Sequence, residues 1–357
     1  MAGRSSQQRA GGSVTSVDVA AHVGLSQATV ARAFSNPEKV APATRARVEA
    51  AADELGYVPN AIARSLKSQR THIVAAVVPS IGEYWQSVLT AFSRGLAARD
   101  RQLLLFSFSD PTQLEDVLAS LAQYRVDGVI LASANIGTSR LARMRDLHLP
   151  MVAFNQPAAS GVVPSVSVDN AAGMQRLAEH VIEAGAVDVA YVGGIAETST
   201  DQMRYRGASQ ALAAAGVACP YTEASGWAYE DGYAAARHLV DAGPLPAAIM
   251  VAGDELAFGV IDALVDRGVS VPGDVMVTGF DGLPQASWAG YDLTTLTQPV
   301  ELLVERAIEL LLSDETDAAA DVVVAGEIRL GRTTKPAAVA AEPSPPTPSQ
   351  NRIETHA

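Results

Sequence analysis

The pattern of hydrophobic and polar residues divides the chain into a short helical segment and a long segment of alternating strands and helices. Between about residues 71 and 335, amphipathic stretches separate the apolar runs IVAAVV, LLLFSF, GVILA, MVAF, VAYVG, AIMVA and VMVTG. This alternation is typical of parallel α/β sheets with helices on both faces. So many units exceed one open sheet, and we expect two doubly wound parallel-sheet subdomains that face each other across a cleft.

Residues 15–58 lack such runs and show helical spacing instead. Thr15 is placed to cap a first helix that ends at Gly24, and Ser26 is placed to cap a second helix. A third helix is expected over about residues 42–55. Two helices joined by a short turn with a glycine indicate an all-α helix-turn-helix head, whose second helix enters the major groove of DNA. A small helical bundle with no role in DNA binding is the alternative that this pattern leaves open.

The start of the second helix carries the candidate DNA contacts, namely Ser26, Gln27, Ala28, Thr29 and, one turn later, Arg32. Gln and Arg side chains hydrogen-bond base edges or phosphates, and an alanine can contact a thymine methyl group. The residue types at this helix start therefore fit direct reading of DNA bases.

A cation-rich segment, residues 59–70, follows the head and is too short to form a stable helix in isolation. Its candidate DNA contacts are Asn60, Arg64, Leu66 and Lys67. An element of this composition can pair with its twin in a second subunit and insert Leu66 into a minor groove. An ordinary amphipathic linker is the alternative interpretation.

The charge distribution strengthens the case for a DNA-binding head. The 357 residues carry a net charge of −13, yet residues 1–70 hold nine Lys or Arg against five Asp or Glu. A basic head on an acidic body suits a head that contacts a polyanion. A chance fluctuation of charge along the chain is the alternative explanation.

Composition excludes several other classes of protein. The single cysteine, Cys219, allows no internal disulfide or Cys-rich zinc site, and the six histidines lack ligand spacing, so we expect no metal and no cofactor. No apolar run approaches the roughly eighteen residues of a spanning helix, and no signal peptide is recognisable. We expect a cytoplasmic, nucleoid-associated protein with no membrane partner, and disordered tails at residues 1–14 and 337–357.

Polar and aromatic residues follow the predicted strands of the body, where an open α/β sheet presents its ligand-binding groups. The candidates are Ser80, Tyr84, Trp85, Asn155, Gln156, Arg204, Trp227, Asp254 and Asp281. Carboxylates, an arginine, amides and aromatic rings together suit a polyhydroxylated ligand. Two alternatives stay open, because Asp169 and Asp254 are also placed to cap helices and the tryptophans can be core or interface residues.

Two stretches, VDVAAHVGLSQATVARAFSN and TRARVEAAADELGYVPNAIARSL, resemble the DNA-binding head and hinge of the lactose-repressor (LacI) family of bacterial transcription regulators. The α/β remainder resembles the periplasmic-binding-protein-like effector core of that family. The resemblance implies a homodimer that binds a palindromic double-stranded DNA operator. It also implies a small-molecule effector, a sugar or sugar acid, that binds between the subdomains and controls the affinity for DNA.

The resemblance also implies roles for single residues. Gln27 and Ala28 match the positions that discriminate operator sequence, and Leu66 matches the intercalating leucine. Arg204 matches the arginine that grips the effector, and Asp254 matches an aspartate of the cleft. Further matches are Arg32 to a base contact and Tyr84 and Trp227 to positions that often stack on the ligand.

The sequence departs from the family at several positions. Ala31 replaces a serine that usually touches phosphate, and Ala41 replaces a serine that usually caps the third helix. Gly282 stands where a second acid is common. We therefore expect a modest operator affinity and the loss of one polar contact to the effector.

The expected domains are a head (15–58), a hinge (59–70) and an effector core (71–336), with an N-subdomain of 71–168 and about 299–323 and a C-subdomain of 169–298 and about 324–336. Two other functions are weighed against a DNA-binding repressor. A periplasmic-type sugar-binding protein without a DNA role needs a signal peptide and has no use for the head. An α/β enzyme is disfavoured because GxGxxG, GxxxxGK[ST] and GxSxG motifs are missing. We therefore expect a ligand-responsive repressor and no enzyme.

Overall fold

The computed structural model describes residues 14–58, 70–79, 82–108, 117, 120–121, 123–132, 149–156, 163–313 and 320–336. The chain divides into two compact units, Met1–His72 and Ile73–Ala357. Several predicted features lie outside the described residues, namely the two tails apart from Val14, the candidate contact Ser80, and the hinge residues Asn60, Arg64, Leu66 and Lys67.

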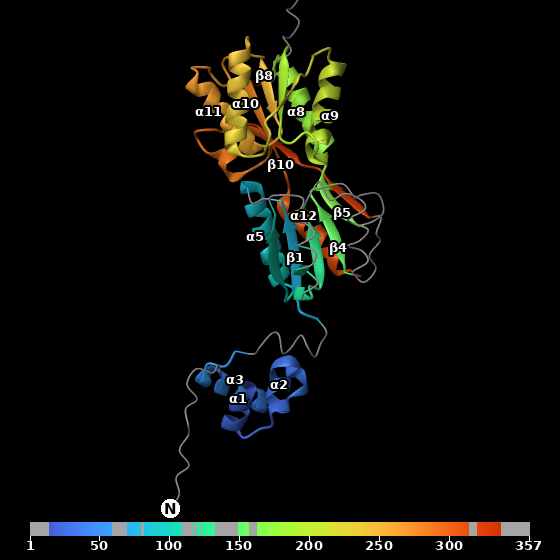
Figure 1. The fold of residues 1–357 in the computed structure, drawn as a ribbon, viewed down its shortest axis with the longest axis vertical. Coiled ribbons are helices and arrows are strands. Elements are labelled where there is room, and N and C mark those ends of the chain that lie inside the picture. Colours follow the sequence, from blue (N-terminus) through green and yellow to red (C-terminus); the bar gives the residue numbers. More distant parts are fainter. Residues whose placement is uncertain are drawn as a thin grey trace, which may run out of the picture. The chain divides into compact units, whose positions relative to one another are not determined.

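The described part of the first unit is helical, as the spacing predicts (Figure 1). Its elements are α1 (Ser16–Val23), α2 (Gln27–Ser35), the 3-10 helix η1 (Pro37–Lys39) and α3 (Pro42–Leu55). The Thr15 N–H donates to Asp18 Oδ2 at 2.9 Å, which is half of a capping box at the start of α1. Gly24 ends α1 in the left-handed conformation with φ 66°, where a glycine carries no steric penalty.

A small apolar core holds the three helices of the head together. Its buried members are Val19, Ala20, Val30, Ala33, Val48 and Ala51. Phe34 and Tyr57 pack at its edge with ring centroids 5.8 Å apart. The predicted loss of a cap on α3 is confirmed, because Ala41 supplies no side-chain hydrogen bond to the helix start.

The described part of the second unit forms two six-stranded sheets. The first sheet consists of β1 (Ile73–Val78), β2 (Gln102–Ser107), β3 (Gly128–Leu131), β4 (Met151–Phe154), β5 (Ser165–Val168) and β11 (Asp321–Val324). The second sheet consists of β6 (Val189–Gly193), β7 (Tyr221–Glu223), β8 (Ala248–Val251), β9 (Met276–Asp281), β10 (Thr294–Thr297) and β12 (Glu327–Arg329). The predicted pair of α/β sheets is therefore confirmed.

Both sheets have the doubly wound strand order. The first runs β2-β1-β3-β4-β5-β11 with parallel pairs throughout, and the second runs β7-β6-β8-β9-β10-β12. The second sheet departs from the expected parallel arrangement at its edge, where β12 pairs antiparallel with β10. The strand order reverses between β1 and β3 and between β6 and β8, and ligands of open α/β sheets bind at such switch points.

Helices cover the faces of both sheets. They are α5 (Glu83–Ala97), α8 (Asn170–Glu183), α9 (Ser199–Ala214), α10 (Tyr229–Ala242), α11 (Asp254–Asp266) and α12 (Val300–Leu312), with the 3-10 helix η3 (Pro284–Ser287) after β9. Figure 1 shows α8 with α9 on one side of the second sheet and α10 with α11 on the other. Helix α12 packs against α5 and the first sheet, although the strand before it belongs to the second sheet.

Among the described elements, the chain crosses between the two sheets three times, namely between β5 and α8, between β10 and α12, and between β11 and β12. Residues in these crossing segments contact both halves of the unit. Segments of this kind are the natural hinges when two halves open and close.

Five of the described strands lie outside the seven apolar runs of the sequence. The composition of two of them shows why these runs missed them. Strands β5 (SVSV) and β10 (TTLT) are rich in hydroxyl residues, yet Ser165, Ser167, Thr294 and Thr295 are buried. A buried hydroxyl is tolerated where it is hydrogen-bonded, and Thr294 Oγ1 lies 2.8 Å from Thr334 Oγ1. A search for apolar runs misses strands that are stabilised in this way.

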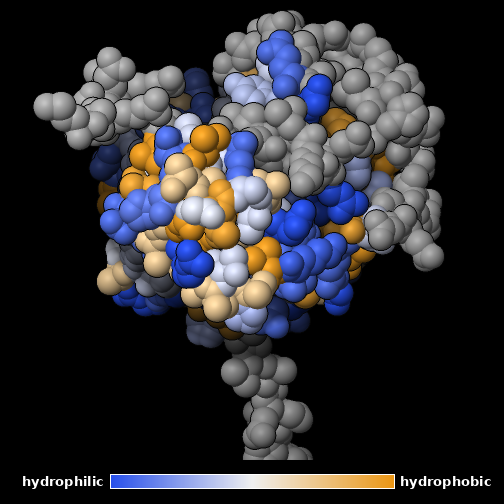
Figure 2. Space-filling view, turned by 90° about the horizontal axis from the view of Figure 1, so that it is seen from below, coloured by the Kyte–Doolittle hydropathy of each residue, from blue (hydrophilic) through white to orange (hydrophobic). Residues whose placement is uncertain are grey.

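Hydrophobic and hydrophilic residues are interspersed on the face of the molecule seen from below (Figure 2). In the ranges that the structure describes, no helix is long and apolar enough to span a bilayer.

Candidate functional site

The start of α2 presents the predicted DNA contacts to solvent. Gln27, Ala28 and Arg32 are all exposed. The Gln27 side chain is oriented by Ser16 at the start of α1, because Gln27 Nε2 donates to Ser16 Oγ at 3.1 Å. A glutamine held in this way keeps a carbonyl oxygen free to accept a hydrogen bond from a base.

The other two candidates on this helix shape its start. Ser26 Oγ accepts a hydrogen bond from the Thr29 N–H at 3.2 Å and lies 2.9 Å from Thr29 Oγ1. Ser26 is therefore the N-cap of α2, as the sequence predicts. A cap bond satisfies one of the unpaired N–H groups of the helix start and fixes the direction in which Gln27 and Ala28 point.

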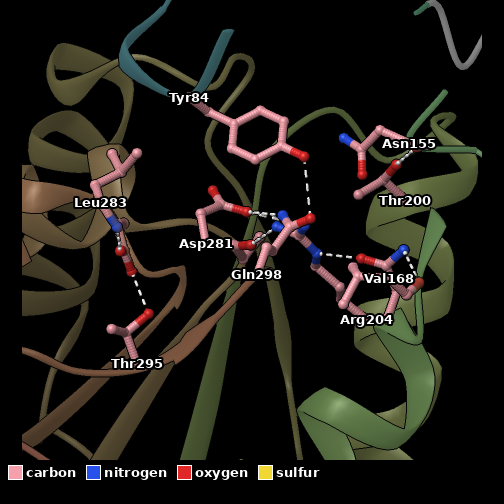
Figure 3. Close-up of polar contacts among 12 residues, drawn as sticks. Tyr84, Asn155, Val168, Thr200, Arg204, Asp281, Leu283, Thr295 and Gln298 are labelled. Carbon is pink, nitrogen blue, oxygen red and sulfur yellow. Dashed lines mark hydrogen bonds and ion pairs between the residues drawn. The ribbon is translucent and has the colours of Figure 1, made fainter. Parts of the chain in front are cut away.

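A second cluster of polar residues surrounds Arg204 on α9 (Figure 3). The side chain is 2% exposed, and its Nε donates to Asn170 Oδ1 at 2.8 Å. Its Nη2 donates to Asp281 Oδ1 at 3.0 Å, and its Nη1 donates to the Ala252 carbonyl oxygen. The centroid of the Phe280 ring lies 3.8 Å from the Arg204 Cζ atom. Protein groups therefore contact every nitrogen and one face of this guanidinium.

Asp281 extends the cluster to the other half of the unit. Its Oδ1 also accepts from Gln298 Nε2 at 2.7 Å, and Gln298 Oε1 accepts from the Tyr84 hydroxyl at 3.0 Å. Burial raises the pKa of Tyr84 well above its ordinary value, so the hydroxyl keeps its proton and can donate. Because Gln298 lies in a crossing segment and Tyr84 on α5, this chain of hydrogen bonds connects the two halves.

Asp254 differs from the expectation for a residue that faces the cleft. It is fully buried, its Oδ2 accepts from the Leu283 N–H at 2.7 Å, and its Oδ1 accepts from the Thr295 hydroxyl at 2.6 Å. Burial, followed by the nearby charge of Asp281, raises the pKa of Asp254. The carboxyl group thus fixes the segment after β9 that carries Asp281.

The helix-capping alternative holds for one of the two aspartates. Asp169 Oδ1 accepts from the Ala172 N–H at 2.9 Å and caps α8. Asp254 instead occupies the first position inside α11, where Gly253 is the N-cap, so the capping interpretation is wrong for Asp254.

The residues after β4 approach α9. Asn155 has a positive φ of 59°, and its carbonyl oxygen accepts from the Thr200 hydroxyl at 3.4 Å. Its buried side-chain Oδ1 has no hydrogen-bond partner among the residues that the structure describes. Gln156 is buried beside it. In Figure 3, the Asn155 side chain and the Tyr84 hydroxyl lie on the same side of Gln298 and Arg204.

The two predicted tryptophans have different surroundings. The Trp227 ring lies against the backbone of Gly194, where an added Cβ would come within 2.6 Å of it, and its centroid is 6.0 Å from Arg204 Cζ. Trp85 packs edge-on against Tyr84, with centroids 5.3 Å apart, and joins the apolar core in part. Both tryptophans are partly buried and pack against the apolar core, so the core interpretation applies in part to each, and Trp227 also borders the Arg204 cluster.

The departure at Gly282 has a steric reason. This residue has a φ of 71°, and an added Cβ would lie 2.5 Å from Thr297 Cα. An acidic side chain does not fit here without a shift of the β10 backbone.

The pattern analysis did not select Gln298, Thr200 or Thr295 as site residues. Gln298 follows a strand directly, which is the signal used for the other candidates, but strand TTLT was itself not recognised. Asn170 is the first residue of α8, and its contact with Arg204 depends on the packing of α8 against α9.

Comparisons with known proteins agree with this architecture. Residues 15–60 match the family of bacterial regulatory proteins named lacI, and residues 178–334 match the periplasmic binding protein-like domain. Catabolite control protein A of Priestia megaterium is 29% identical over 330 residues, which cover 90% of this chain and 99% of that protein. The HTH-type transcriptional repressor PurR of Pectobacterium carotovorum is 32% identical over 313 residues, which cover 86% of this chain and 92% of that protein.

Among solved structures, a complex of the transcriptional regulator CelR with cellobiose is 28% identical with a TM-score of 0.67, covering 90% of this chain and 99% of that chain. These relatives are regulators of transcription and not enzymes, which excludes the enzyme alternative. The helix-turn-helix also excludes a binding protein without a DNA role. The chain therefore belongs to the lacI family of bacterial regulatory proteins, and it is a ligand-responsive DNA-binding regulator of transcription.

Proposed function

We propose that this protein is a homodimeric repressor that binds a roughly palindromic operator. The exposed start of α2, with Gln27, Ala28 and Arg32, supports the assignment of base contacts. One such helix reads only a half-site, and a dimer places two of them one helical turn of DNA apart. The hinge, residues 59–70, would pair with its twin, and Leu66 would kink the centre of the operator.

The effector in this proposal is a sugar or sugar acid that binds between the two sheets. The observation that carries this assignment is the hydrogen-bonded chain from Tyr84 through Gln298 and Asp281 to Arg204. It lies at the carboxyl ends of β8 and β9, where open α/β sheets bind ligands. CelR, a relative of similar length, binds the sugar cellobiose.

The predicted contact residues take different parts in this proposal. Tyr84, Asn155, Arg204, Trp227 and Asp281 would contact the effector, and Gln156 would support Asn155. Asp254 would position the segment that carries Asp281, since both of its oxygens already accept hydrogen bonds from the protein. Trp85 would support Tyr84 from the core side.

Regulation would follow from closure of the two halves around the effector. The three crossing segments act as hinges, and an effector that binds one closure state more tightly shifts the population toward that state. The resulting change in the spacing between the two 59–70 segments of the dimer would alter operator affinity by a coupling free energy of about 1 to 3 kcal/mol.

The domain division proposed with this function is a head at 15–58, a hinge at 59–70 and a two-part core at 71–336. The N-subdomain would comprise 71–168 and about 299–323, and the C-subdomain 169–298 and about 324–336. The sheet membership of β11 and β12 supports a boundary near residue 324, because these consecutive strands join different sheets.

A gel-shift assay on genomic fragments tests the proposal directly. The full-length protein should retain a small set of fragments with a shared palindromic sequence, and one compound from a panel of sugars and sugar acids should change that retention. Retention of all fragments alike, or of none, would refute the operator assignment.

A further inference from the structure

The positive charge of Arg204 is already neutralised inside the protein. Its Nη2 donates to Asp281 at 3.0 Å, its other nitrogens contact Asn170 and Ala252, and its side chain is 2% exposed. An anion gains most from an arginine that offers unpaired donors in a fork. In Arg204, Nη2 already donates to Asp281 Oδ1 and Nη1 to the Ala252 carbonyl oxygen.

Carboxyl groups outnumber this cation around the site. Glu255 at the start of α11 accepts a hydrogen bond from the backbone N–H of Glu83 at 3.2 Å, and Gln285 Nε2 donates to Glu83 Oε2 at 2.8 Å. Burial, then Glu83 and Asp281, raise the pKa of Glu255. The carboxyl groups of Glu83, Glu255, Asp254 and Asp281 thus lie around the guanidinium of Arg204. Desolvating a further negative charge beside them is unfavourable.

The hydrogen-bonding groups of the site that lack a partner also favour a ligand with hydroxyl groups. The Oδ1 atom of Asn155 is a buried acceptor without a partner, and such an atom requires a donor. A ligand hydroxyl can donate to this atom, whereas a carboxylate oxygen at neutral pH only accepts. The Trp227 ring beside Arg204 offers an apolar face for the C–H side of a sugar ring.

We propose that the effector is an uncharged polyhydroxyl compound, and that sugar acids and sugar phosphates are excluded from this site. The Asn155 side chain accepts from a ligand hydroxyl, and Asp281 accepts from another. Arg204 holds Asp281 in place, and the ion pair of these two residues presents no net charge to the ligand. This inference rests on the proposed function, because it concerns the ligand of the same site.

Thermal unfolding of the full-length protein in inorganic phosphate tests the charge state of the site without knowledge of the effector. Ionic strength is held constant with sodium chloride. Phosphate stabilises folded proteins in general, so the melting temperature of the wild type should rise with phosphate only as much as that of a control variant, whereas Asp281→Asn uncovers Arg204 and should show a larger rise. The control is Asp241→Asn, which makes the same charge change beside Arg267 at an exposed ion pair of 2.7 Å. It should match the wild type.

Two results of this measurement would overturn the proposal. One is a phosphate-dependent rise in the wild type that Arg204→Gln reduces, since the guanidinium would then be open to anions. The other is a folded Asp281→Asn variant that responds no more than Asp241→Asn, since Asp281 would then not be what neutralises Arg204.

A second measurement uses wild-type protein alone and covers the case in which Asp281→Asn does not fold. The measurement is the concentration of each compound that releases the protein from a retained DNA fragment. Glucose is compared with gluconate and glucose 6-phosphate, and cellobiose is compared with cellobionate. A charged compound should require at least about tenfold more than its parent. Release by an acid or phosphate where the parent is inactive would overturn the proposal. If no fragment is retained at all, the operator assignment has failed, and the phosphate measurement still decides the charge of the site.

Discussion

The Tyr84 hydroxyl donates a hydrogen bond of 3.0 Å to Gln298 Oε1, and this bond connects α5 to a segment that crosses from the second sheet. Gln298 passes the contact on to Asp281, which also holds Arg204. The bond is buried and links parts of the chain that are 214 residues apart. It is therefore well placed to respond to closure of the two halves.

Replacing Tyr84 with phenylalanine should lower the free energy of unfolding by about 1 to 3 kcal/mol, because Gln298 Oε1 loses its buried donor. The effector concentration for half-maximal response should change as well. Urea denaturation and operator titration measure the two effects. Tyr124→Phe is a matched control at an exposed tyrosine and should change neither. An effect of equal size in the control would contradict the role of the Tyr84 hydroxyl.

Replacing Gln27 and Ala28 together should change the preferred operator half-site. These side chains are exposed at the start of α2, and each altered base contact should shift discrimination by about 1 to 3 kcal/mol. Selection from a random DNA pool gives the consensus of each protein. Glu38→Gln, an exposed change on η1, is the control. The same consensus from wild type and double variant would assign specificity elsewhere.

Ala41→Ser should stabilise the head. Ala41 precedes α3 and supplies no cap, so a serine hydroxyl there can accept from an unpaired N–H and add about 0.5 to 2 kcal/mol. Chemical denaturation followed by circular dichroism measures the gain. Ala46→Ser places the same hydroxyl inside the helix, where no free N–H is available, and should destabilise slightly. If Ala41→Ser does not raise the free energy of unfolding above that of Ala46→Ser, the start of α3 needs no cap.

Asp201 on α9 should make stability fall as pH rises. Burial raises its pKa above the ordinary value of 3.8, although Tyr221 donates to its Oδ2 at 2.7 Å and the Gly194 N–H donates to its Oδ1 at 3.0 Å. The folded state then binds the proton more tightly than the unfolded state. The contribution of Asp201 to the free energy of unfolding is therefore highest at low pH and declines from about pH 4 up to the raised pKa.

The variant Asp201→Asn removes this titration and should flatten the decline above about pH 4. Urea denaturation at several pH values measures the difference between the two proteins, with Asp53→Asn as an exposed control. A variant with a steeper decline than the wild type would reverse the predicted sign.

Local features of the sequence determined the head almost completely. Helix α1 begins after Thr15 and ends at Gly24, α2 begins after Ser26, and α3 ends at Gly56. These ends are visible in the sequence because caps and left-handed turns depend on neighbouring residues only. Apolar runs likewise located most central strands of the body, since strands buried on both faces need continuous apolar residues. The hydroxyl-rich strands β5 and β10 lack that signal, because their burial depends on hydrogen bonds to distant residues.

The sequence by itself also indicated which residue types gather at the sheet edges, because polar residues after strands are visible along the chain. Only the tertiary structure decided which of them meet. Arg204 contacts Asn170 and Asp281, which lie 34 and 77 residues away along the chain, and Gln298 joins them through a crossing segment. The tertiary structure also decided that Asp254 points inward, where it accepts hydrogen bonds from the Leu283 N–H and the Thr295 hydroxyl. The physical reason is that strand order and the three crossings fix these distances, and neither is encoded by local spacing.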